Sequence, residues 1–558
     1  MARAPQKPLQ VDTLTHADAK RKNIPTAEFE SVMRDQDKKP IPLAYERRNR
    51  DLDPQLVWRG KDEQDEADLI VQAPPLYIQE KVHPKALIDD LVRQTKAQTP
   101  NDAPEFSLFA DFNGLPDPEA ATEFYAHDQH WSNRMICGDS LSVMGSLAER
   151  EGLRGKVQCI YFDPPYGIKF NSNFQWSTTS RDVKDGAKDH ITREPEQVRA
   201  FRDTWKDGIH SYLTYLRDRL TMARDLLSDS GSIFVQIGDE NVHRVRALMD
   251  EVFGEENFVS EIAVKKTTSA TTSYLAGTMD FVTWFSKDKP KLKFRQPLKL
   301  KEAGAAGAVA YNRVQSIDGA DVRPLKNGEV WSERDGYLVS SDNLTSQSGG
   351  DTTRFDALFH GVPFKVTKGG WKTNEAGMKR LRRASRLTPG GVALRYVRRI
   401  DDYSVVAIGN LWDDMPTGSF TEDKIYVVQS AEKLVSRCIL MTTDPGDLVL
   451  DPTCGSGTTA TVAEQWGRRW ITIDTSRVAI ALARSRLMGA RYPYYLLADS
   501  PEGQAKEGEL TRTPPKTTPT YGSLRQGFVY ERVPHITLKS IANNAEIDVI
   551  WARMQPAV

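Results

Sequence analysis

Hydrophobic residues recur along the chain with two different spacings, which separate predicted strands from predicted helices. Compact apolar runs bounded by turn residues are typical of buried strands, whereas apolar residues at every third or fourth position indicate helices. The compact runs predict strands at residues 134–137, 157–162, 232–237, 258–264, 281–285, 448–450 and 470–473. The wider spacing predicts helices at residues 142–151, 210–227, 241–253 and 476–488. Because strands and helices alternate, the pattern predicts an α/β fold built on a doubly wound sheet.

The regular alternation is interrupted by stretches of a different character. Residues 1–125 are polar, and we expect a partly extended or disordered arm whose apolar islands, residues 56–58 and 76–78, dock on another surface. Between residues 290 and 404 the pattern breaks into Gly-rich and basic segments, which indicates an insertion. The resulting domains are 1–125, 126–289, 290–404, 405–502 and 503–558. We interpret the last as a connector, followed in a longer protein by further chain.

Composition excludes several classes of protein. A hydrophobic content of 39% and a charged content of 27% are those of an ordinary soluble domain protein. No apolar run approaches the length of a membrane span, and residues 1–14 lack the apolar stretch that a signal peptide would have. Its four cysteines are too widely separated for a zinc site or a disulfide framework, which favours a cytoplasmic location. We expect no metal site.

The tetrapeptide Asp163-Pro164-Pro165-Tyr166 directly follows the predicted strand at residues 157–162. Two prolines cannot continue a sheet ladder, so the chain must leave the strand there as a stiff turn. The turn offers a carboxylate, a backbone carbonyl and an aromatic ring, which together can hold a flat base that bears an exocyclic amine. The alternative is a structural Pro-Pro turn with a capping aspartate.

A Gly-rich loop follows the predicted strand at residues 448–450. Glycines let the backbone approach a ligand, and the helix start after them offers free N–H groups to an anion. Asp474, which ends the next strand, is placed to accept ribose hydroxyl groups. Gly455, Gly457 and Ala460 also satisfy a loose dinucleotide pattern, but the preceding Asp-Pro and the following Thr-Thr favour S-adenosylmethionine. The loop residues assigned to the cofactor are Asp451, Pro452, Cys454, Gly455, Ser456, Gly457, Thr458 and Thr459.

Together the two motifs resemble those of beta-class amino-methyltransferases, which modify adenine N6 or cytosine N4 in DNA. The chain looks most like the modification (Mod) subunit of type III restriction-modification systems, over roughly residues 130–290 and 405–500. The resemblance implies a Rossmann-like, circularly permuted and mostly parallel sheet, completed by the strands near residues 448 and 471. It also implies that the insertion is an α+β target-recognition domain. The implied partners are double-stranded DNA, a helicase-nuclease restriction subunit and a second copy of the chain.

The resemblance assigns roles to individual residues. Asp163 and the Pro164 carbonyl would accept the hydrogens of the target amine, while Tyr166 would stack on the extruded base. Asp139 corresponds to an acceptor for the cofactor adenine, although it serves equally well as the N-cap of the following helix, and Asp499 competes for the role. Gln429 and Lys433 lie where the family contacts the cofactor carboxylate, although Lys433 fits a surface position equally well.

A concentrated basic run lies inside the insertion. Between residues 365 and 399 there are eleven Lys or Arg residues and one acidic residue, Glu375. Such a patch suits DNA phosphates, and the flanking Trp371 and Tyr396 favour that interpretation over a merely solvated helix face. The predicted nucleic-acid-binding residues are Lys365, Lys368, Lys372, Lys379, Arg380, Arg382, Arg383 and Arg386.

The sequence therefore predicts an adenine N6 DNA methyltransferase dependent on S-adenosylmethionine. Cytosine N4 is the second candidate base, but in the family such enzymes more often carry Ser where this chain has Asp163. A non-catalytic DNA-recognition scaffold in a phage-defence complex and an RNA methyltransferase are the alternatives from other classes.

Overall fold

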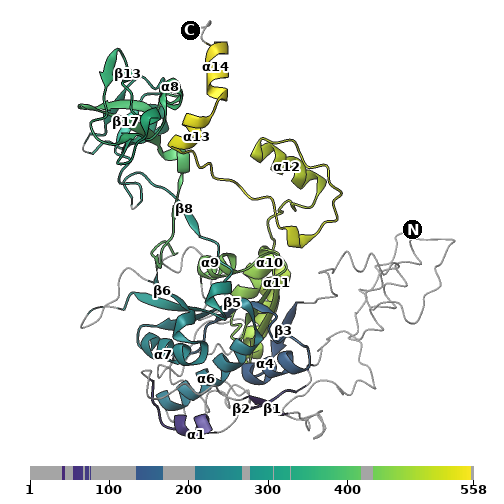
Figure 1. Ribbon diagram of the computed structural model, residues 1–558. Helices are drawn as coiled ribbons and strands as arrows, with labels where there is room; N and C mark the ends of the chain where they lie inside the picture. The colour runs from purple at the N-terminus through teal and green to yellow at the C-terminus, as the bar shows by residue number, and fades with distance from the viewer. Residues whose placement is uncertain are drawn as a thin grey trace, which may run out of the picture. The chain divides into compact units, whose positions relative to one another are not determined.

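A computed structural model gives the fold of the protein (Figure 1). It describes residues 40–43, 55–66, 69–74, 76, 133–166, 208–266, 275, 277–305, 307–326, 328–415 and 431–554. The contacts divide the chain into two units. Unit 1 comprises Met1–Arg295, Asn410–Gln504 and Thr518–Phe528, and unit 2 comprises Gln296–Gly409, Ala505–Thr517 and Val529–Val558.

Unit 1 is built on an eight-stranded sheet in the order β19-β6-β7-β5-β4-β20-β21-β3. All neighbouring pairs are parallel except those that involve β7. The strands are β3 (Arg134–Cys137), β4 (Val157–Phe162), β5 (Leu227–Gly238), β6 (Phe258–Lys265), β7 (Met279–Ser286), β19 (Leu411–Trp412), β20 (Leu448–Asp451) and β21 (Arg469–Asp474). This arrangement confirms the predicted Rossmann-like, mostly parallel sheet and its permuted chain order.

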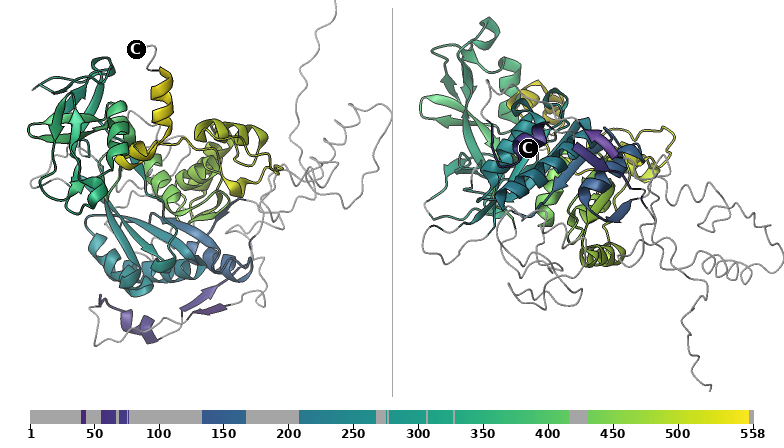
Figure 2. Two further views of the ribbon diagram at one scale, coloured as in Figure 1. Left: turned by 45° about the horizontal axis from the view of Figure 1, so that its top comes forward. Right: turned by 90° about the horizontal axis from the view of Figure 1, so that it is seen from below.

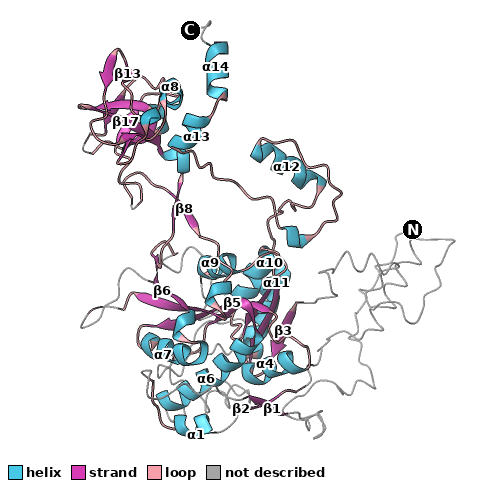
Figure 3. Ribbon diagram, viewed as in Figure 1, coloured by secondary structure: helices cyan, strands magenta, loops and turns pink. Residues whose placement is uncertain are grey.

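Helices cover both faces of this sheet, so its central strands are apolar on both sides. One face is covered by α4 (Ser140–Glu149), α6 (Ile209–Leu226) and α7 (Val242–Phe253), whose buried residues form one cluster with the strands. The other carries α9 (Glu432–Thr442), α10 (Thr458–Gln465) and α11 (Arg477–Gly489). Figures 2 and 3 show the sheet between these two layers. In β4 every residue is buried, and every residue except Gln158 is apolar.

Part of the N-terminal arm packs on unit 1, in agreement with the docking segment predicted at residues 56–58. Trp58 is buried in the main core and its indole N–H donates to Thr214 Oγ1 on α6, at 3.1 Å. The short elements here are β1 (Pro40–Leu43), α1 (Lys61–Glu66) and β2 (Leu69–Gln72), and β1 and β2 pair in antiparallel fashion. The other predicted docking segment, beyond Leu76, lies outside the described residues.

Unit 2 contains a five-stranded antiparallel sheet in the order β10-β9-β11-β17-β16. Its strands are β9 (Arg313–Gln315), β10 (Val322–Pro324), β11 (Tyr337–Asn343), β16 (Leu387–Gly390) and β17 (Ala393–Arg399). Smaller antiparallel pairs are β8 (Leu298–Leu300) with β18 (Val405–Ala407), β12 (Thr345–Ser346) with β15 (Gly370–Trp371), and β13 (Ala357–Phe359) with β14 (Val362–Phe364). With helix α8 (Glu375–Arg383), this is the α+β insertion that the sequence predicts.

Two C-terminal segments, Ala505–Thr517 and Val529–Val558, belong to the same unit as the insertion, whereas Thr518–Phe528 belong to unit 1. Ile541 and Ala542 of α13 (Leu538–Asn543) are buried against Met378 and Leu381 of α8. Helix α14 (Glu546–Met554) follows, while α12 (Pro501–Thr511) spans the boundary between the units. The strand-like run before Asp499 is not a strand: Leu497 makes only an isolated bridge with Phe528.

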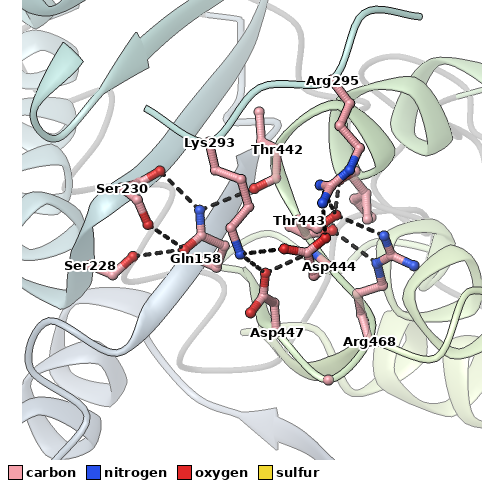
Figure 4. Close-up of polar contacts among 12 residues, drawn as sticks. Gln158, Ser228, Ser230, Lys293, Arg295, Thr442, Thr443, Asp444, Asp447 and Arg468 are labelled. Atoms are coloured by element: carbon pink, nitrogen blue, oxygen red, sulfur yellow. Dashed lines mark hydrogen bonds and ion pairs between the residues drawn. The ribbon is translucent and has the colours of Figure 1, made fainter. Parts of the chain in front are cut away.

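Charged side chains tie the end of the first segment of unit 1 to the turn that precedes β20 (Figure 4). The Lys293 ammonium lies 2.6 Å from Asp447 and 2.9 Å from Asp444, and Arg295 also pairs with Asp444. Arg468 donates to the carbonyl of Thr443, 2.8 Å away, directly before this turn. The ion pairs therefore hold the exit toward the insertion against the turn that begins β20. Among the described helices, none is both long and apolar enough to cross a membrane.

Candidate active site

The two sequence motifs meet at one edge of the large sheet. Strands β4 and β20 are parallel neighbours, with Val449 opposite Cys159 and Leu450 opposite Ile160. From β4 the chain continues through α6 to β5 on one side, and from β20 through α10 to β21 on the other. Ligands of open α/β sheets bind where the strand order reverses in this way, beyond the carboxyl ends of the strands. The Asp-Pro-Pro-Tyr turn and the Gly-rich loop both begin at this point.

A direct hydrogen bond joins the turn to the loop. The backbone N–H of Asp163 donates to Thr453 Oγ1, at 3.0 Å. Asp163 is half-buried, Pro164 is buried, and Pro165 and Tyr166 are half-buried. The turn is therefore fixed against the loop while its carboxylate and ring keep partial access to solvent.

Tyr166 is held at both ends by residues that the sequence did not single out. Its carbonyl accepts from Asn241 Nδ2 at 2.7 Å, and its hydroxyl accepts from Gln236 Nε2 at 2.8 Å. The Tyr166 hydroxyl also lies 3.4 Å from Asp280 Oδ2. Burial, followed by the Asp163 and Asp280 carboxylates, raises the pKa of Tyr166 well above its ordinary value. The phenol therefore stays protonated at neutral pH.

The Gly-rich loop closes onto the next strand through its backbone. The N–H of Cys454 donates to the carbonyl of Ile473 at 2.8 Å, and that of Gly455 donates to the Asp474 carboxylate at 2.9 Å. Gly457 precedes α10 in the left-handed region, with φ 75°, and a Cβ there would lie 2.8 Å from that of Ala483. Only glycine fits this position. The remaining assigned residues are all buried: Pro452, Ser456, Thr458 and Thr459.

A buried carboxylate stands at the base of the loop. Asp451 accepts from the backbone N–H of Thr453 at 2.9 Å. Burial raises the pKa of Asp451 to about 6, against the lowering effect of its hydrogen bonds from Thr459 and Thr453. A cation bound beside it would recover part of the cost of burying this charge. The α-ammonium of a methionine moiety is such a cation.

The aspartates proposed for the nucleoside have different surroundings. Asp474 ends β21 and accepts from Gly455 and Ser476 N–H groups. Asp139 caps α4, accepting from the N–H groups of Leu141 and Ser142, and pairs with Arg219. Its capping role is therefore observed. Asp499 is buried and accepts from the N–H groups of two residues, Tyr521 and Ser523, so it braces a turn.

Two residues near the start of α9, Gln429 and Lys433, were expected to contact the cofactor carboxylate. Gln429 lies outside the described residues. Lys433 forms an ion pair with Asp414 at 2.8 Å, and Arg437 pairs with the same carboxylate. Lys433 therefore has a structural partner within unit 1.

Arg486 on α11 donates hydrogen bonds to side chains of the Gly-rich loop, and the sequence analysis did not single it out. Its guanidinium donates to Thr458 Oγ1 at 2.9 Å and to Ser456 Oγ at 3.3 Å, and it pairs with Glu432 on α9. The side chain is almost fully buried. No motif marks it, because its contacts come from residues distant in the sequence.

Some side chains of the basic run in unit 2 are exposed, and others form ion pairs within the unit. Arg386 is buried and forms a two-pronged pair with the buried Asp402, which corrects its assignment to a DNA-binding surface. Arg380 and Arg383 both pair with Asp548 of α14. The exposed members are Lys365, Lys368, Lys372, Lys379 and Arg382.

Two of these exposed lysines already have acidic partners. Lys365 and Lys379 make exposed ion pairs, Lys365 with Asp356 at 3.3 Å and Lys379 with Glu375 at 3.0 Å. Trp371 and Tyr396, expected to flank a DNA surface, are buried in the core. Their burial removes one argument for that surface and leaves the charges to support it.

Comparisons with known proteins agree with this geometry. The family model described as "DNA methylase" matches residues 157–485, more than half of the chain. The "Probable type III restriction-modification enzyme HindVI Mod subunit" of Haemophilus influenzae is 24% identical, over 69% of this chain and 54% of that protein. "Type II methyltransferase M.EcaI" of Enterobacter cloacae is 25% identical over 65% and 70%, respectively. The "Type III restriction-modification enzyme EcoP15I Mod subunit" of Escherichia coli is 26% identical over 32% and 28%. The chain thus spans about half the length of the HindVI subunit.

Proposed function

Because the chain belongs to the DNA methylase family, we propose that it transfers a methyl group from S-adenosylmethionine to N6 of adenine in DNA. One observation carries the proposal: the Asp163 turn and the Gly-rich loop follow adjacent parallel strands and are hydrogen-bonded to each other. A base held by the turn would lie beside a cofactor held by the loop.

The loop residues suit the methyl donor. The backbone of residues 454–457 would approach the methionine part, Asp451 would face its ammonium group, and Asp474 would accept the ribose hydroxyls. When bound, S-adenosylmethionine supplies an electrophilic methyl group on a sulfonium. Arg486 would hold the loop in place through Ser456 and Thr458.

The turn supplies the groups that act on the base. The adenine amine is a weak nucleophile because its lone pair is delocalised into the ring. Hydrogen bonds from its two N–H groups to the Asp163 carboxylate and the Pro164 carbonyl would free that lone pair for in-line attack. One amine proton must leave when the new N–C bond forms, and the Asp163 carboxylate is the acceptor in reach.

DNA binding and partners follow from the same proposal. The exposed cations of unit 2, led by Lys368, Lys379 and Arg382, would neutralise backbone phosphates. The relatives named Mod subunits support a modification role with a helicase-nuclease restriction subunit as partner, and a second copy of the chain is a further proposed partner.

Adenine N6 is preferred over cytosine N4 because the motif begins with Asp163 rather than Ser. To test both the reaction and the base, the protein is incubated with methyl-labelled S-adenosylmethionine and genomic DNA, and the digested nucleosides are separated by mass spectrometry. The proposal predicts labelled N6-methyladenine. Labelled N4-methylcytosine would replace the base assignment, and transfer only to RNA would replace the substrate. Absence of any label would favour the non-catalytic scaffold.

A further inference from the structure

A chain of hydrogen-bonded polar side chains, partly buried and partly half-buried, lies at the carboxyl edge of the sheet and includes the tyrosine of the catalytic turn. Tyr161 on β4 donates its hydroxyl hydrogen to Gln236 Oε1 on β5. Gln236 Nε2 donates to the Tyr166 hydroxyl at 2.8 Å. The Tyr166 hydroxyl in turn donates to Asp280 Oδ2 on β7 at 3.4 Å. Four side chains from three strands and the turn are thereby connected.

The hydrogen bonds of this chain all point the same way, from Tyr161 toward Asp280. Tyr161 is 1% exposed and Gln236 is 7% exposed, so both must find partners inside the protein. Because the Tyr161 hydroxyl donates to the Gln236 amide oxygen, the amide nitrogen faces Tyr166 and donates to the Tyr166 hydroxyl oxygen. The Tyr166 hydrogen is then left for Asp280. Such a chain is stable only when each member is satisfied, and here each is.

Asp280, the last member of the chain, forms an ion pair with an exposed lysine. Its carboxylate lies 3.0 Å from the ammonium of Lys266, which follows β6. The same ammonium lies 5.7 Å from the centre of the Tyr166 ring. At the other end of the residue, Asn241 holds the Tyr166 carbonyl, and Arg244 Nη1 donates to Asn241 Oδ1 at 2.7 Å. The phenol is thus restrained through both its hydroxyl and its backbone.

Stacking on a base needs only an aromatic ring, and a phenylalanine would supply one. The hydroxyl and its partners therefore have a different effect: they restrict the plane in which the ring can lie. We propose that Gln236 and Asp280 are positioning residues that fix the Tyr166 ring as a preformed stacking face for the extruded target base. This inference rests on the proposed function and extends it to two residues outside both motifs.

The test uses the unsubstituted chain and three variants: Tyr166→Phe, Gln236→Leu and the double variant. Base extrusion is followed by the fluorescence of 2-aminopurine, which replaces the target adenine at a mapped methylation site, and methyl transfer is followed separately at saturating cofactor. Each single variant is expected to lower the extrusion signal and kcat by about tenfold, with little change in the Kd for the cofactor. The double variant is expected to be no worse than either single one, because both substitutions break the same chain.

A matched control comes from the same sheet. Thr283 on β7 is fully buried, and its hydroxyl has no hydrogen-bond partner among the described residues. Thr283→Val should leave extrusion and kcat unchanged, which separates positioning of the ring from general disturbance of the strand. A second variant, Asp280→Asn, keeps an acceptor for the phenol and should retain more extrusion than Asp280→Leu.

The outcomes distinguish the two proposals. If the wild type extrudes and methylates the base but the two single effects multiply in the double variant, the positioning role is wrong while the function stands. The same holds if extrusion is unchanged in both single variants. A wild type that neither extrudes nor methylates overturns the proposed function, and this inference with it.

Discussion

The backbone amide of Asp163 donates to the hydroxyl of Thr453, 3.0 Å away, and the same hydroxyl lies 3.4 Å from Asp451 Oδ1. One threonine therefore connects the acidic residue of the catalytic turn with the acidic residue at the base of the cofactor loop. The two residues are far apart in the sequence and meet only because β4 and β20 are parallel neighbours. This contact sets the spacing between the groups that would bind the amine and the methyl donor.

Substitution of Thr453 tests that spacing. Thr453→Val removes the acceptor of the Asp163 N–H and the donor to Asp451, while keeping the shape of the side chain. Loss of a partner for this partly buried N–H costs about 1 kcal/mol or more, and we expect kcat for methyl transfer to fall by about tenfold. Thr453→Ser, which keeps the hydroxyl, should retain most activity. Equal activity of the valine and serine variants in a single-turnover assay would show that the contact has no effect on the reaction.

The raised pKa of Asp451, about 6, predicts how cofactor binding depends on pH. In the free protein this carboxyl is partly protonated near pH 6, and a bound ammonium favours its ionised form. Binding should therefore release a proton, and affinity should increase as the pH rises through about 6. Titration calorimetry with S-adenosylmethionine in two buffers of different ionisation enthalpy measures the proton. Asp451→Asn should bind more weakly and without this pH dependence, and an unchanged dependence in that variant would assign the proton to another group.

Substitutions in the basic run are predicted to affect either DNA binding or stability, depending on whether the side chain is exposed or buried. Lys379 and Arg382 are exposed, so Lys379→Ala/Arg382→Ala should weaken DNA binding and make it less dependent on salt, with an unchanged melting temperature. Arg386→Ala should instead lower the stability of unit 2 by about 3–5 kcal/mol, because it leaves the buried Asp402 without its ion-pair partner. Filter binding over a range of salt concentrations and thermal unfolding separate the two effects. A stable Arg386→Ala protein with weakened DNA binding would reverse the assignment.

The ionic contacts of Figure 4 predict a pH-dependent contribution to stability. Lys293→Met leaves Asp444 and Asp447 without their shared ammonium and should lower the free energy of unfolding by about 1 kcal/mol at neutral pH. Although burial opposes ionisation, the hydrogen bond from Lys293 keeps the pKa of Asp444 below its ordinary value. The stabilisation is therefore present above the ordinary pKa of an aspartate and is lost as the pH falls through the lowered value. Denaturant titrations at neutral and acidic pH should show the difference disappearing. Lys291→Met, at a more exposed pair, is the control.

The sequence predicted the strands and helices of unit 1 well because their signals are local. A buried parallel strand such as β4 is apolar at every position except Gln158, and a turn with two prolines can only follow it. That β20 completes the same sheet came from the resemblance to a family, and only the fold shows that β4 and β20 are neighbours. The contacts then showed that the two motifs share a hydrogen bond.

The contacts that the sequence did not reveal are those between distant charged and polar residues. Arg386 resembles its exposed neighbours in the run, and only the fold brings Asp402 to it. Asp548, distant in the sequence, similarly pairs with both Arg380 and Arg383. A count of charges along the sequence records none of these partners. For the same reason Gln236 was read as one more residue of an apolar strand.

The central claim is that Asp163 acts on the target amine beside a methyl donor held by the neighbouring loop. It is tested most directly by single-turnover transfer of labelled methyl to DNA with Asp163→Asn, in parallel with binding of the cofactor and of DNA. The asparagine keeps the size of the side chain but removes the negative charge. We predict that transfer falls by about a thousandfold or more while both binding constants stay within about threefold of the wild type. Transfer at the wild-type rate by Asp163→Asn would contradict the claim.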